Sequence, residues 1–239
     1  MAAFSRFSLQ LSRNSSGSGY AAVVPAEPTA PTETRGRPRL RRDDEILDAA
    51  LLAFATHGYA GMSLRQLNSE LGLSHGTISH RYGSKERLFY AAVDHGFGGL
   101  IAEMDDEVGR RPPAADELAQ VRERFRAFLV VSARRPELVR LMNQEGLHAS
   151  DRLNYIFDTY IQPALADTIA TLERLASAGV LRPVPARAWF FLLTHGAAAP
   201  YTLTALSARF DPVDGPLDEL AHAELITDVT INALRRPDP

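Results

Sequence analysis

The sequence has no cysteine, and only one lysine and one tryptophan, among its 239 residues. The absence of cysteine excludes disulfide frameworks, thiolate nucleophiles and cysteine-ligated zinc or iron–sulfur sites. No run approaches the roughly 18 apolar residues that a membrane helix needs, so we expect no membrane partner. A composition of 45% hydrophobic and 23% charged residues excludes wholesale disorder and rod-like assemblies. The length allows one large domain or a small domain joined to a larger one.

The net charge of −3 is unevenly distributed along the chain. Residues 1–92 carry eleven Arg or Lys against eight Asp or Glu, whereas the remaining residues carry fifteen against twenty-one. Five arginines without an intervening acid fall within one short segment: Arg35, Arg37, Arg39, Arg41 and Arg42. A basic cluster beside an acidic body indicates a local contact with a polyanion.

Residues 1–34 are rich in Ser, Gly, Ala and Pro and lack a sustained helical or strand periodicity. This composition predicts a disordered tail, because too little apolar surface is available to offset the entropy of folding. The first twenty residues contain Arg6, Arg13 and several serines but no acid, which leaves an organelle transit peptide open as an alternative.

From Asp43 onward the chain is patterned as successive amphipathic helices. Apolar residues from Ile46 to Phe54 recur at the spacing of one helical face, and acids occupy the first turn, where the helix dipole favours them. We expect Gly58 to end this helix. Ser63 and Gln66 form a capping-box pattern, in which each side chain satisfies a free backbone amide at the start of a second helix.

The next turn and helices follow closely. Gly72 predicts a turn, and Ser74 is expected to cap a third helix that holds Ile78 and Tyr82 on its inner face. A long fourth helix is expected to begin near Lys85.

Beyond Arg110 the pattern predicts about five more helices, and no segment alternates in the manner of a strand. The breaks between these helices are expected at residues 110–113, 133–137, 148–151, 179–185 and 210–216. The predicted fold class is therefore all-α.

Two short helices joined by a turn with glycine form the layout of a helix-turn-helix. Its second helix must enter a major groove about 12 Å wide, so its leading face needs side chains that reach base edges without bulk. This requirement fits the residues that precede and begin the third predicted helix, namely His75, Gly76, Thr77, Ser79 and His80.

The segment from Ile46 to Phe89 resembles the DNA-binding domain of the tetracycline-repressor (TetR) family of bacterial transcription regulators. The motifs that carry this resemblance are Phe54 with Gly58-Tyr59, Ser63 before Leu64-Arg65, Gly72, Gly76-Thr77-Ile78 and Gly83-Ser84-Lys85-Glu86. The resemblance implies a homodimer, a recognition helix at residues 74–82, double-stranded DNA as partner and a C-terminal helical domain that binds a small apolar effector. We further expect that the effector tilts the fourth helix and so changes the spacing of the two recognition helices.

Position by position, the resemblance implies that Arg65, His75, Thr77, Ser79 and His80 read bases. It implies that Ser63, Arg81 and Lys85 contact phosphates. Two positions depart from the family pattern: Ser79 replaces the usual aromatic residue, and Asn68 replaces a small residue where two helix backbones approach closely. We expect Arg81 to replace the lost contact and Asn68 to widen the separation of the helices slightly.

The arginines at positions 35, 37 and 39 form an arm that is predicted to lie in a narrow A·T minor groove. A solvated linker is the alternative interpretation of this arm. The predicted domains are then a disordered tail at 1–34, the basic arm and DNA-binding domain at 35–92, and an effector-binding and dimerisation domain at 93–239.

The C-terminal part is rich in aromatic residues, most of which are expected to form core. Several side chains are candidates to line an effector pocket: Phe125, Phe128, Met142, Tyr155, Phe191, Thr194 and His195. The resemblance implies that two helices at 186–209 and 216–234 form the dimer interface, and Pro200 is expected to interrupt the first. An internal helix crossing is the alternative for these two helices.

Nothing in the sequence demands catalysis, and no cofactor is expected. Glu145 and His148 form a single Glu-x-x-His pattern, which predicts a capped helix end or a polar group of the pocket rather than a metal site, because di-iron bundles need two copies. The leading function is a DNA-binding repressor in the bacterial cytoplasm. One alternative is an architectural DNA-binding protein. The other is a helical protein without specific DNA binding, either a carrier of small molecules or lipids or an enzyme.

Overall fold

The computed structural model describes residues 41–236 of the chain. The predictions for the tail at 1–34 and for Arg35, Arg37 and Arg39 therefore concern residues outside the described range. Within that range the regular structure is helical, apart from an isolated bridge between Leu181 and Arg235, so the all-α fold class is confirmed. No helix in this range is both long and apolar enough to cross a lipid bilayer.

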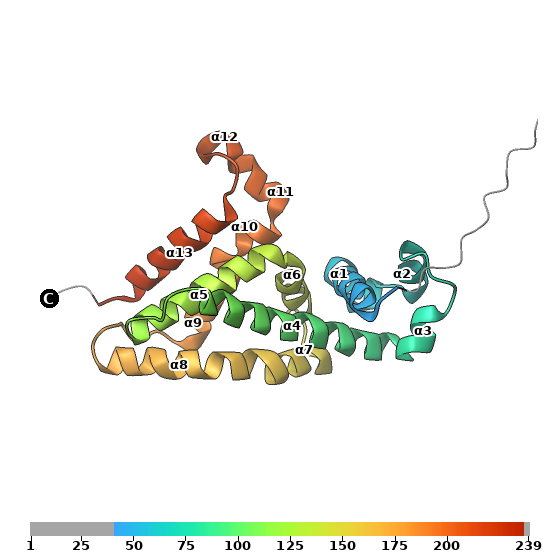
Figure 1. The fold of residues 1–239 in the computed structure, drawn as a ribbon, viewed down its shortest axis with the longest axis horizontal. Helices are drawn as coiled ribbons and strands as arrows, with labels where there is room; N and C mark the ends of the chain where they lie inside the picture. Colours follow the sequence, from blue (N-terminus) through green and yellow to red (C-terminus); the bar gives the residue numbers. More distant parts are fainter. Residues whose placement is uncertain (1–40, 237–239) are drawn as a thin grey trace, which may run out of the picture. The chain divides into compact units, whose positions relative to one another are not determined.

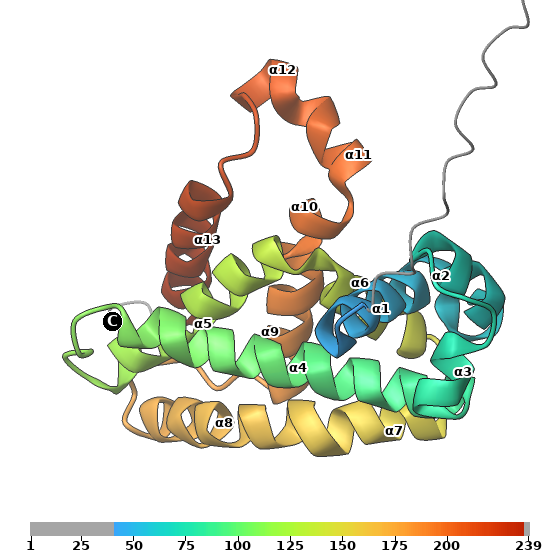
Figure 2. The ribbon, with the colours of Figure 1, turned by 45° about the vertical axis from the view of Figure 1, so that its right-hand side comes forward.

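The first four helices follow the predicted order. They are α1 (Asp43–Gly61), α2 (Leu64–Glu70), α3 (Thr77–Tyr82) and α4 (Lys85–Gly109). Gly58 breaks α1 as expected, since its φ of 67° and ψ of 169° lie outside the helical region. Figure 2 shows α3 at the start of α4, with α1 packed across α4. The predicted domain boundary after residue 92 falls inside α4, which both predicted domains therefore share.

Most of the helices that follow begin and end close to the predicted breaks, but α12 (Asp211–Asp214) lies within the break expected at 210–216 (Figure 1). They are α5 (Glu117–Arg134), α6 (Pro136–Glu145), α7 (Asp151–Ile156), α8 (Gln162–Ser177), α9 (Ala186–Phe191), α10 (Ala199–Thr202), α11 (Thr204–Ser207), α12 (Asp211–Asp214) and α13 (Glu219–Leu234). A short 3₁₀ turn, Ala208–Phe210, joins α11 to α12. The helix expected at 186–209 is instead a series of short pieces, one of which begins at Ala199, directly before Pro200.

Two π-helical segments interrupt this series. Phe157–Ile161 joins α7 to α8, and Leu192–Ala197 joins α9 to α10. A π turn carries one residue more than an α turn and is frequent at functional sites, because it redirects the side chains on one face.

The buried apolar side chains form two clusters. The first packs α1 to α4 against α6 and α7 around Ile46, Phe54, Ile78 and Phe89, each fully buried. The second packs α5, α8, α9 and α13, with Phe125 stacked against Trp189 at 5.6 Å between ring centroids. α4 runs beside α5 and so links the two clusters.

Candidate nucleic-acid interface and apolar cavity

The start of α2 is capped by Ser63, whose hydroxyl accepts a hydrogen bond from the Gln66 amide at 3.4 Å. The reciprocal half of the predicted capping box is wrong. The Gln66 side-chain amide instead donates to Glu70 Oε1 at 2.8 Å, an i, i+4 contact along the surface of α2.

Asn68 binds α2 to α3. It is 3% exposed; its side-chain amide donates to the Leu64 carbonyl at 2.8 Å, and its Oδ1 accepts from the Ile78 amide at 3.2 Å. The Ile78 amide is one of the four amides that the first turn of a helix leaves without a partner. Asn68 therefore fixes the start of α3 relative to α2, a role that the sequence analysis did not assign to it.

The predicted recognition helix, α3, begins later than expected, at Thr77, and its N-cap is Gly76 with a φ of 83° rather than Ser74. Ser74 bonds to Thr77 instead: their hydroxyl oxygens lie 2.7 Å apart, and Thr77 Oγ1 donates to the Ser74 carbonyl at 2.9 Å. The predicted side-chain cap at Ser74 is therefore wrong. A left-handed Gly76 turns the chain into α3 and leaves no Cβ on the outer side of that turn.

The outer face of the α2–α3 unit presents the predicted base-reading residues. Five of them are exposed, namely Arg65, His75, Gly76, Ser79 and His80, and Thr77 is half-buried. Ile78 is fully buried and Tyr82 is half-buried against the first cluster, which confirms their predicted inward direction.

The predicted phosphate-binding cations both have partners within the chain. Arg81 donates to Asp43 Oδ1 and to the Arg41 carbonyl, both at 3.0 Å. Lys85 Nζ donates to the Ala60 carbonyl at 3.2 Å and lies 4.9 Å from the centroid of the Tyr59 ring. These contacts hold Arg81 at the start of α1 and Lys85 at its end.

Asp43 also accepts a hydrogen bond from the Tyr82 hydroxyl at 3.3 Å. Burial and the neighbouring Asp43 raise the pKa of Tyr82 to about 12. Asp43 thus joins the first turn of α1 to the last turn of α3.

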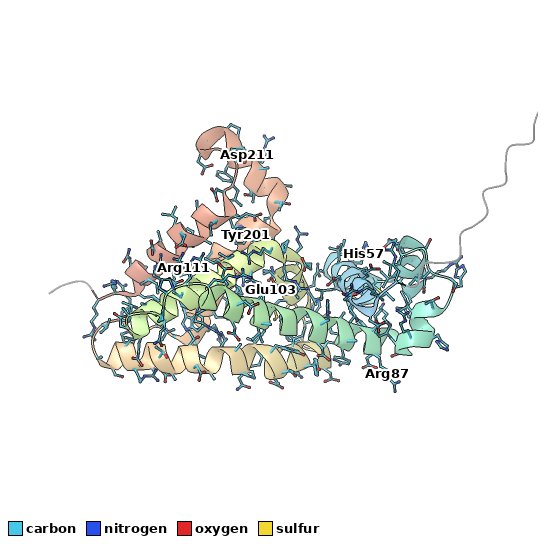
Figure 3. The ribbon with its side chains drawn as sticks, in the orientation of Figure 1. His57, Arg87, Glu103, Arg111, Tyr201 and Asp211 are labelled. Atoms are coloured by element: carbon cyan, nitrogen blue, oxygen red, sulfur yellow. The ribbon has the colours of Figure 1, made fainter. Side chains whose placement is uncertain are left out.

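Arg87 is a further exposed cation that the sequence analysis did not select. It lies two residues after Lys85, in the first turn of α4. Its side chain extends away from the helices in Figure 3. Its position in the turn directly after the recognition helix was the available signal.

A cavity of about 120 Å³ lies between α4, α5, α6, α8 and α9. Its lining is mostly apolar and aromatic, including Phe97, Leu100, Trp189 and Phe190. Of the side chains predicted for a pocket, five line this cavity: Phe125, Phe128, Met142, Thr194 and His195. Both π segments contribute to its wall, through Tyr160 and Ile161 and through Leu193 to His195.

Two residues predicted for the pocket lie elsewhere, and the prediction is wrong for both. Tyr155 packs against the first cluster and donates to Asp94 Oδ1 at 2.6 Å, a hydrogen bond that, with burial, raises the pKa of Tyr155 to about 12. Phe191 is 51% exposed and its neighbour Leu192 is 50% exposed, whereas Leu193 and Thr194 of the π segment are buried.

The polar groups of the cavity wall are mostly satisfied by the protein. Arg124 pairs with Asp105 at 2.6 Å, Tyr160 donates to Asp94 at 2.7 Å, and the Thr194 hydroxyl donates to the Phe190 carbonyl at 2.7 Å. Asn143 differs, because its buried Oδ1 has no hydrogen-bond partner. Such a buried acceptor is expensive to leave unpaired.

Glu145 and His148 do not act together. Glu145 is 5% exposed and accepts a hydrogen bond from Arg152 Nε at 2.9 Å, whereas His148 is exposed. Both predicted roles for the pattern are therefore wrong, since Glu145 neither caps the helix nor lines the cavity but holds an arginine of α7.

Large apolar side chains are exposed along the segment that runs from α9 to α13. They are Phe191, Leu192, Leu203, Leu206, Phe210, Val213, Leu217, Leu220, Leu225 and Val229. An exposed set of this extent indicates a surface that another molecule covers.

Comparison with known proteins separates the two parts of the chain. Residues 46–92 match the family model of bacterial regulatory proteins, tetR family. The transcriptional repressor AcnR of Corynebacterium efficiens is 49% identical over 47 residues, which are 20% of this chain and 25% of AcnR. The aligned region thus spans about a quarter of this curated relative.

Solved structures extend the likeness in fold. A bacterial regulatory protein in the tetR family from Rhodococcus RHA1 has a TM-score of 0.58 at 18% identity, over 83% of this chain and 100% of that chain. AibR, solved in complex with isovaleryl coenzyme A and operator DNA, has a TM-score of 0.54 at 16% identity, over 77% and 95%. The sequence likeness to AcnR is thus local, whereas the fold likeness includes the helices behind α4.

Proposed function

We propose that this chain is a homodimeric transcriptional repressor of the tetR family in the bacterial cytoplasm, because residues 46–92 match the family model and the fold resembles that of a tetR-family protein over 83% of the chain. An uncharged, mostly apolar effector releases it from a palindromic operator. The observation that carries the proposal is α3, a short helix fixed to α2 by Asn68 while its outer residues stay exposed. A helix held in this way can enter a major groove.

In the dimer, two copies of α3 lie roughly 34 Å apart and read successive major grooves on one side of the duplex. Arg65, His75, Ser79 and His80 contact base edges, together with the backbone of Gly76. Thr77 contributes its methyl group, because its hydroxyl hydrogen is already used by the Ser74 carbonyl. Ser63, Arg81, Lys85 and the missed Arg87 bind phosphates, and Arg35, Arg37 and Arg39 follow the minor groove.

Selection of duplexes from a random pool by the purified full chain tests this function. The proposal expects one two-fold symmetric site, and Ser79→Ala should relax the sequence preference at one position of each half-site. An architectural protein would enrich no sequence, and a carrier would retain no duplex, so either result contradicts the proposal.

The phosphate contacts are tested by the salt dependence of binding to the selected duplex. Lys85→Ala and Arg87→Ala should each reduce the slope of log affinity against log salt by about one while leaving the selected sequence unchanged. Arg187→Ala, an exposed arginine on α9, is the matched control and should leave the slope unchanged.

The exposed apolar side chains of α9 to α13 support the dimer. Leu206 and Leu225 are 58% and 62% exposed, and a charge at either position would be buried in the interface. Sedimentation should therefore find a monomer for Leu206→Glu and Leu225→Glu. Leu147→Glu, at a position 68% exposed beyond α6, should remain a dimer.

The cavity supports an effector of limited size and no charge. Its volume of about 120 Å³ is close to that of an engineered cavity of about 150 Å³ that binds benzene. Arg124 is already paired with Asp105, so an anionic effector would be buried without a free cation. The unpaired Oδ1 of Asn143 favours an effector with one hydrogen-bond donor.

Three compounds of matched shape test this chemistry by calorimetric titration: toluene, benzyl alcohol and benzoate. Benzyl alcohol should bind most tightly, toluene more weakly and benzoate not at all. Asn143→Leu should remove the preference for the alcohol over toluene. A preference for benzoate would contradict the proposed effector class while leaving the DNA-binding function intact.

A repressor also requires reciprocal coupling. If the effector weakens operator binding by a given factor, the operator must weaken effector binding by the same factor. Titration of benzyl alcohol into the chain with and without the selected duplex measures this factor, and equal affinities would reject release by the effector.

A further inference from the structure

Arg152 at the start of α7 contacts the aromatic side chains that join α1 to α4. Its guanidinium carbon lies 4.0 Å from the centroid of the Tyr59 ring and 5.7 Å from that of Phe89. Both distances are within the roughly 6 Å over which a cation is attracted to a ring face. Arg152 is thus a direct contact from the helices behind α4 to the end of α1.

The position of Arg152 is set by Glu145, the last residue of α6. The two side chains pair at 2.9 Å, and the Glu145 side chain is only 4% exposed against 28% for Arg152. A buried carboxylate must keep its counter-charge, because an unpaired charge in the interior is strongly unfavourable. Arg152 will therefore follow any displacement of the end of α6.

The end of α6 also borders the cavity. Met142 and Asn143 line it, and the next residue, Gln144, has its Oε1 3.9 Å from the position that a Cβ on Gly58 would occupy. An occupant that contacts Met142 or Asn143 thus acts on the same turn that holds Glu145.

Tyr59 connects this turn to the DNA-binding surface. Its ring stacks on Phe54 with centroids 5.9 Å apart and meets Phe89 edge to face at 5.6 Å. The Lys85 ammonium, a proposed phosphate ligand, lies 4.9 Å from the same ring. Arg152 of α7 and Lys85 of α4 therefore contact the same aromatic ring, that of Tyr59.

We propose that Glu145, Arg152 and Tyr59 form a latch through which occupancy of the cavity changes the position of the DNA-binding domain. The latch rests on the proposed function, since it supplies the regulation of that site. An occupant shifts the last turn of α6, Glu145 draws Arg152 with it, and the guanidinium leaves the Tyr59 ring. Arg152 is a positioning residue, because it touches neither the cavity nor the DNA-binding surface.

The latch predicts that the effect of cavity occupancy on the DNA-binding domain will depend on Arg152, even though α4 also borders the cavity. Hydrogen exchange of the amides at 59–62 and 85–88 is the primary readout, because it needs no DNA. Benzyl alcohol at saturation should change exchange at these amides at least threefold in the wild-type chain. In Arg152→Met the change should fall within experimental error of no effect.

Companion variants separate the latch from simple loss of stability. Glu145→Gln/Arg152→Met removes both charges, leaves no buried charge unpaired and should also uncouple. Arg152→Lys keeps the ion pair but not the planar stacking, so it should retain part of the response. Arg174→Met removes an arginine from the exposed pair with Glu117 and should respond as wild type.

A wild-type response that survives in both Arg152→Met and the double variant overturns the latch, as does a wild-type chain that shows no response with its cavity filled. If benzyl alcohol does not bind, Ala164→Leu, which fills the cavity from α8, replaces it in the same comparison. Failure of the wild-type chain to select a duplex contradicts the proposed function but leaves the exchange result on the latch intact.

Discussion

The two apolar clusters in the described part of the chain differ in how completely side chains fill the space between the helices. Around α1 to α4 the large side chains are fully buried and meet in aromatic contacts, with Phe54 and Phe89 at 5.0 Å between ring centroids. Around α5, α8 and α9 the helices adjoin π segments and border a cavity, whose wall also takes Phe97 and Leu138 from the edge of the first cluster. Under the proposed function, the first region holds one short helix at a fixed angle, whereas the second admits a ligand and responds to it. Close packing serves the first task and opposes the second.

The sharpest test of this contrast replaces one phenylalanine in each region. Phe89→Ala should lower the free energy of unfolding by about 3–5 kcal/mol, because it opens a cavity in a filled core. Phe128→Ala should cost about 1–2 kcal/mol, since that side chain is half-buried and already borders empty space. Urea unfolding followed by circular dichroism measures both, and equal losses would remove the distinction between the two regions.

Stability in acid should depend on Glu107, a buried carboxylate that accepts hydrogen bonds from Arg126 and Arg134. Burial would raise the pKa of Glu107, but hydrogen bonds from Arg126 and Arg134 outweigh it and hold this pKa below its usual value. The carboxylate therefore stabilises the fold fully above the unfolded pKa of about 4.3, and this contribution is lost as the pH falls through the lower folded pKa. Glu107→Gln should cost about 2–3 kcal/mol at pH 7, because Arg126 keeps its second partner, Glu224.

Thermal unfolding between pH 3 and pH 7 checks the prediction for Glu107. The variant should lose less stability in acid than the wild type, and Glu117→Gln, from an exposed pair, should behave as wild type. A wild-type acid response in Glu107→Gln would show that other carboxylates dominate.

Within the first region, Asn68 makes the connection on which α3 depends. Asn68→Ala leaves the buried Ile78 amide without its acceptor and should cost about 1–2 kcal/mol. DNA affinity should fall by more than this loss of stability accounts for, because α3 is no longer held to α2. Asn154→Ala, at an exposed position on α7, should change neither quantity.

The smallest effect is expected at Tyr82. Its hydroxyl bonds to an exposed carboxylate, so Tyr82→Phe should cost only about 0.5 kcal/mol at pH 7. Because its folded pKa is raised to about 12, the stabilisation is fully present below about pH 10 and is lost as the pH rises towards 12. Ultraviolet titration should assign a late-titrating tyrosine that disappears in this variant.

Local patterns predicted much of the first region correctly. Gly58 breaks α1, Ser63 caps α2, and Ile78 is buried, because glycine, N-cap serine and helical periodicity act over a few residues. The errors arose where two local partners compete. Gln66 had Glu70 within reach, and Ser74 had Thr77, and a capping pattern does not rank such alternatives.

The second region was predicted in outline only. Most breaks between helices were predicted close to their observed positions, but nothing in the sequence signalled the two π segments, and Phe191, a candidate for the pocket wall, is exposed. Arg152 was missed for a related reason: its partners, Tyr59 and Glu145, come from two other helices. Contacts between distant segments depend on tertiary packing, which periodicity does not encode.

The π turns also bear on how such a regulator can acquire a new effector. Each holds one residue more than the α-helical turn that it replaces, so removal of a single residue from Phe157–Ile161 or Leu192–Ala197 can restore a regular helix. Under the proposed function, such a deletion would change the wall that faces the effector, while the helices proposed to read DNA, encoded upstream, would stay unchanged. New chemical specificity could in this way arise by deletion, without a change of operator.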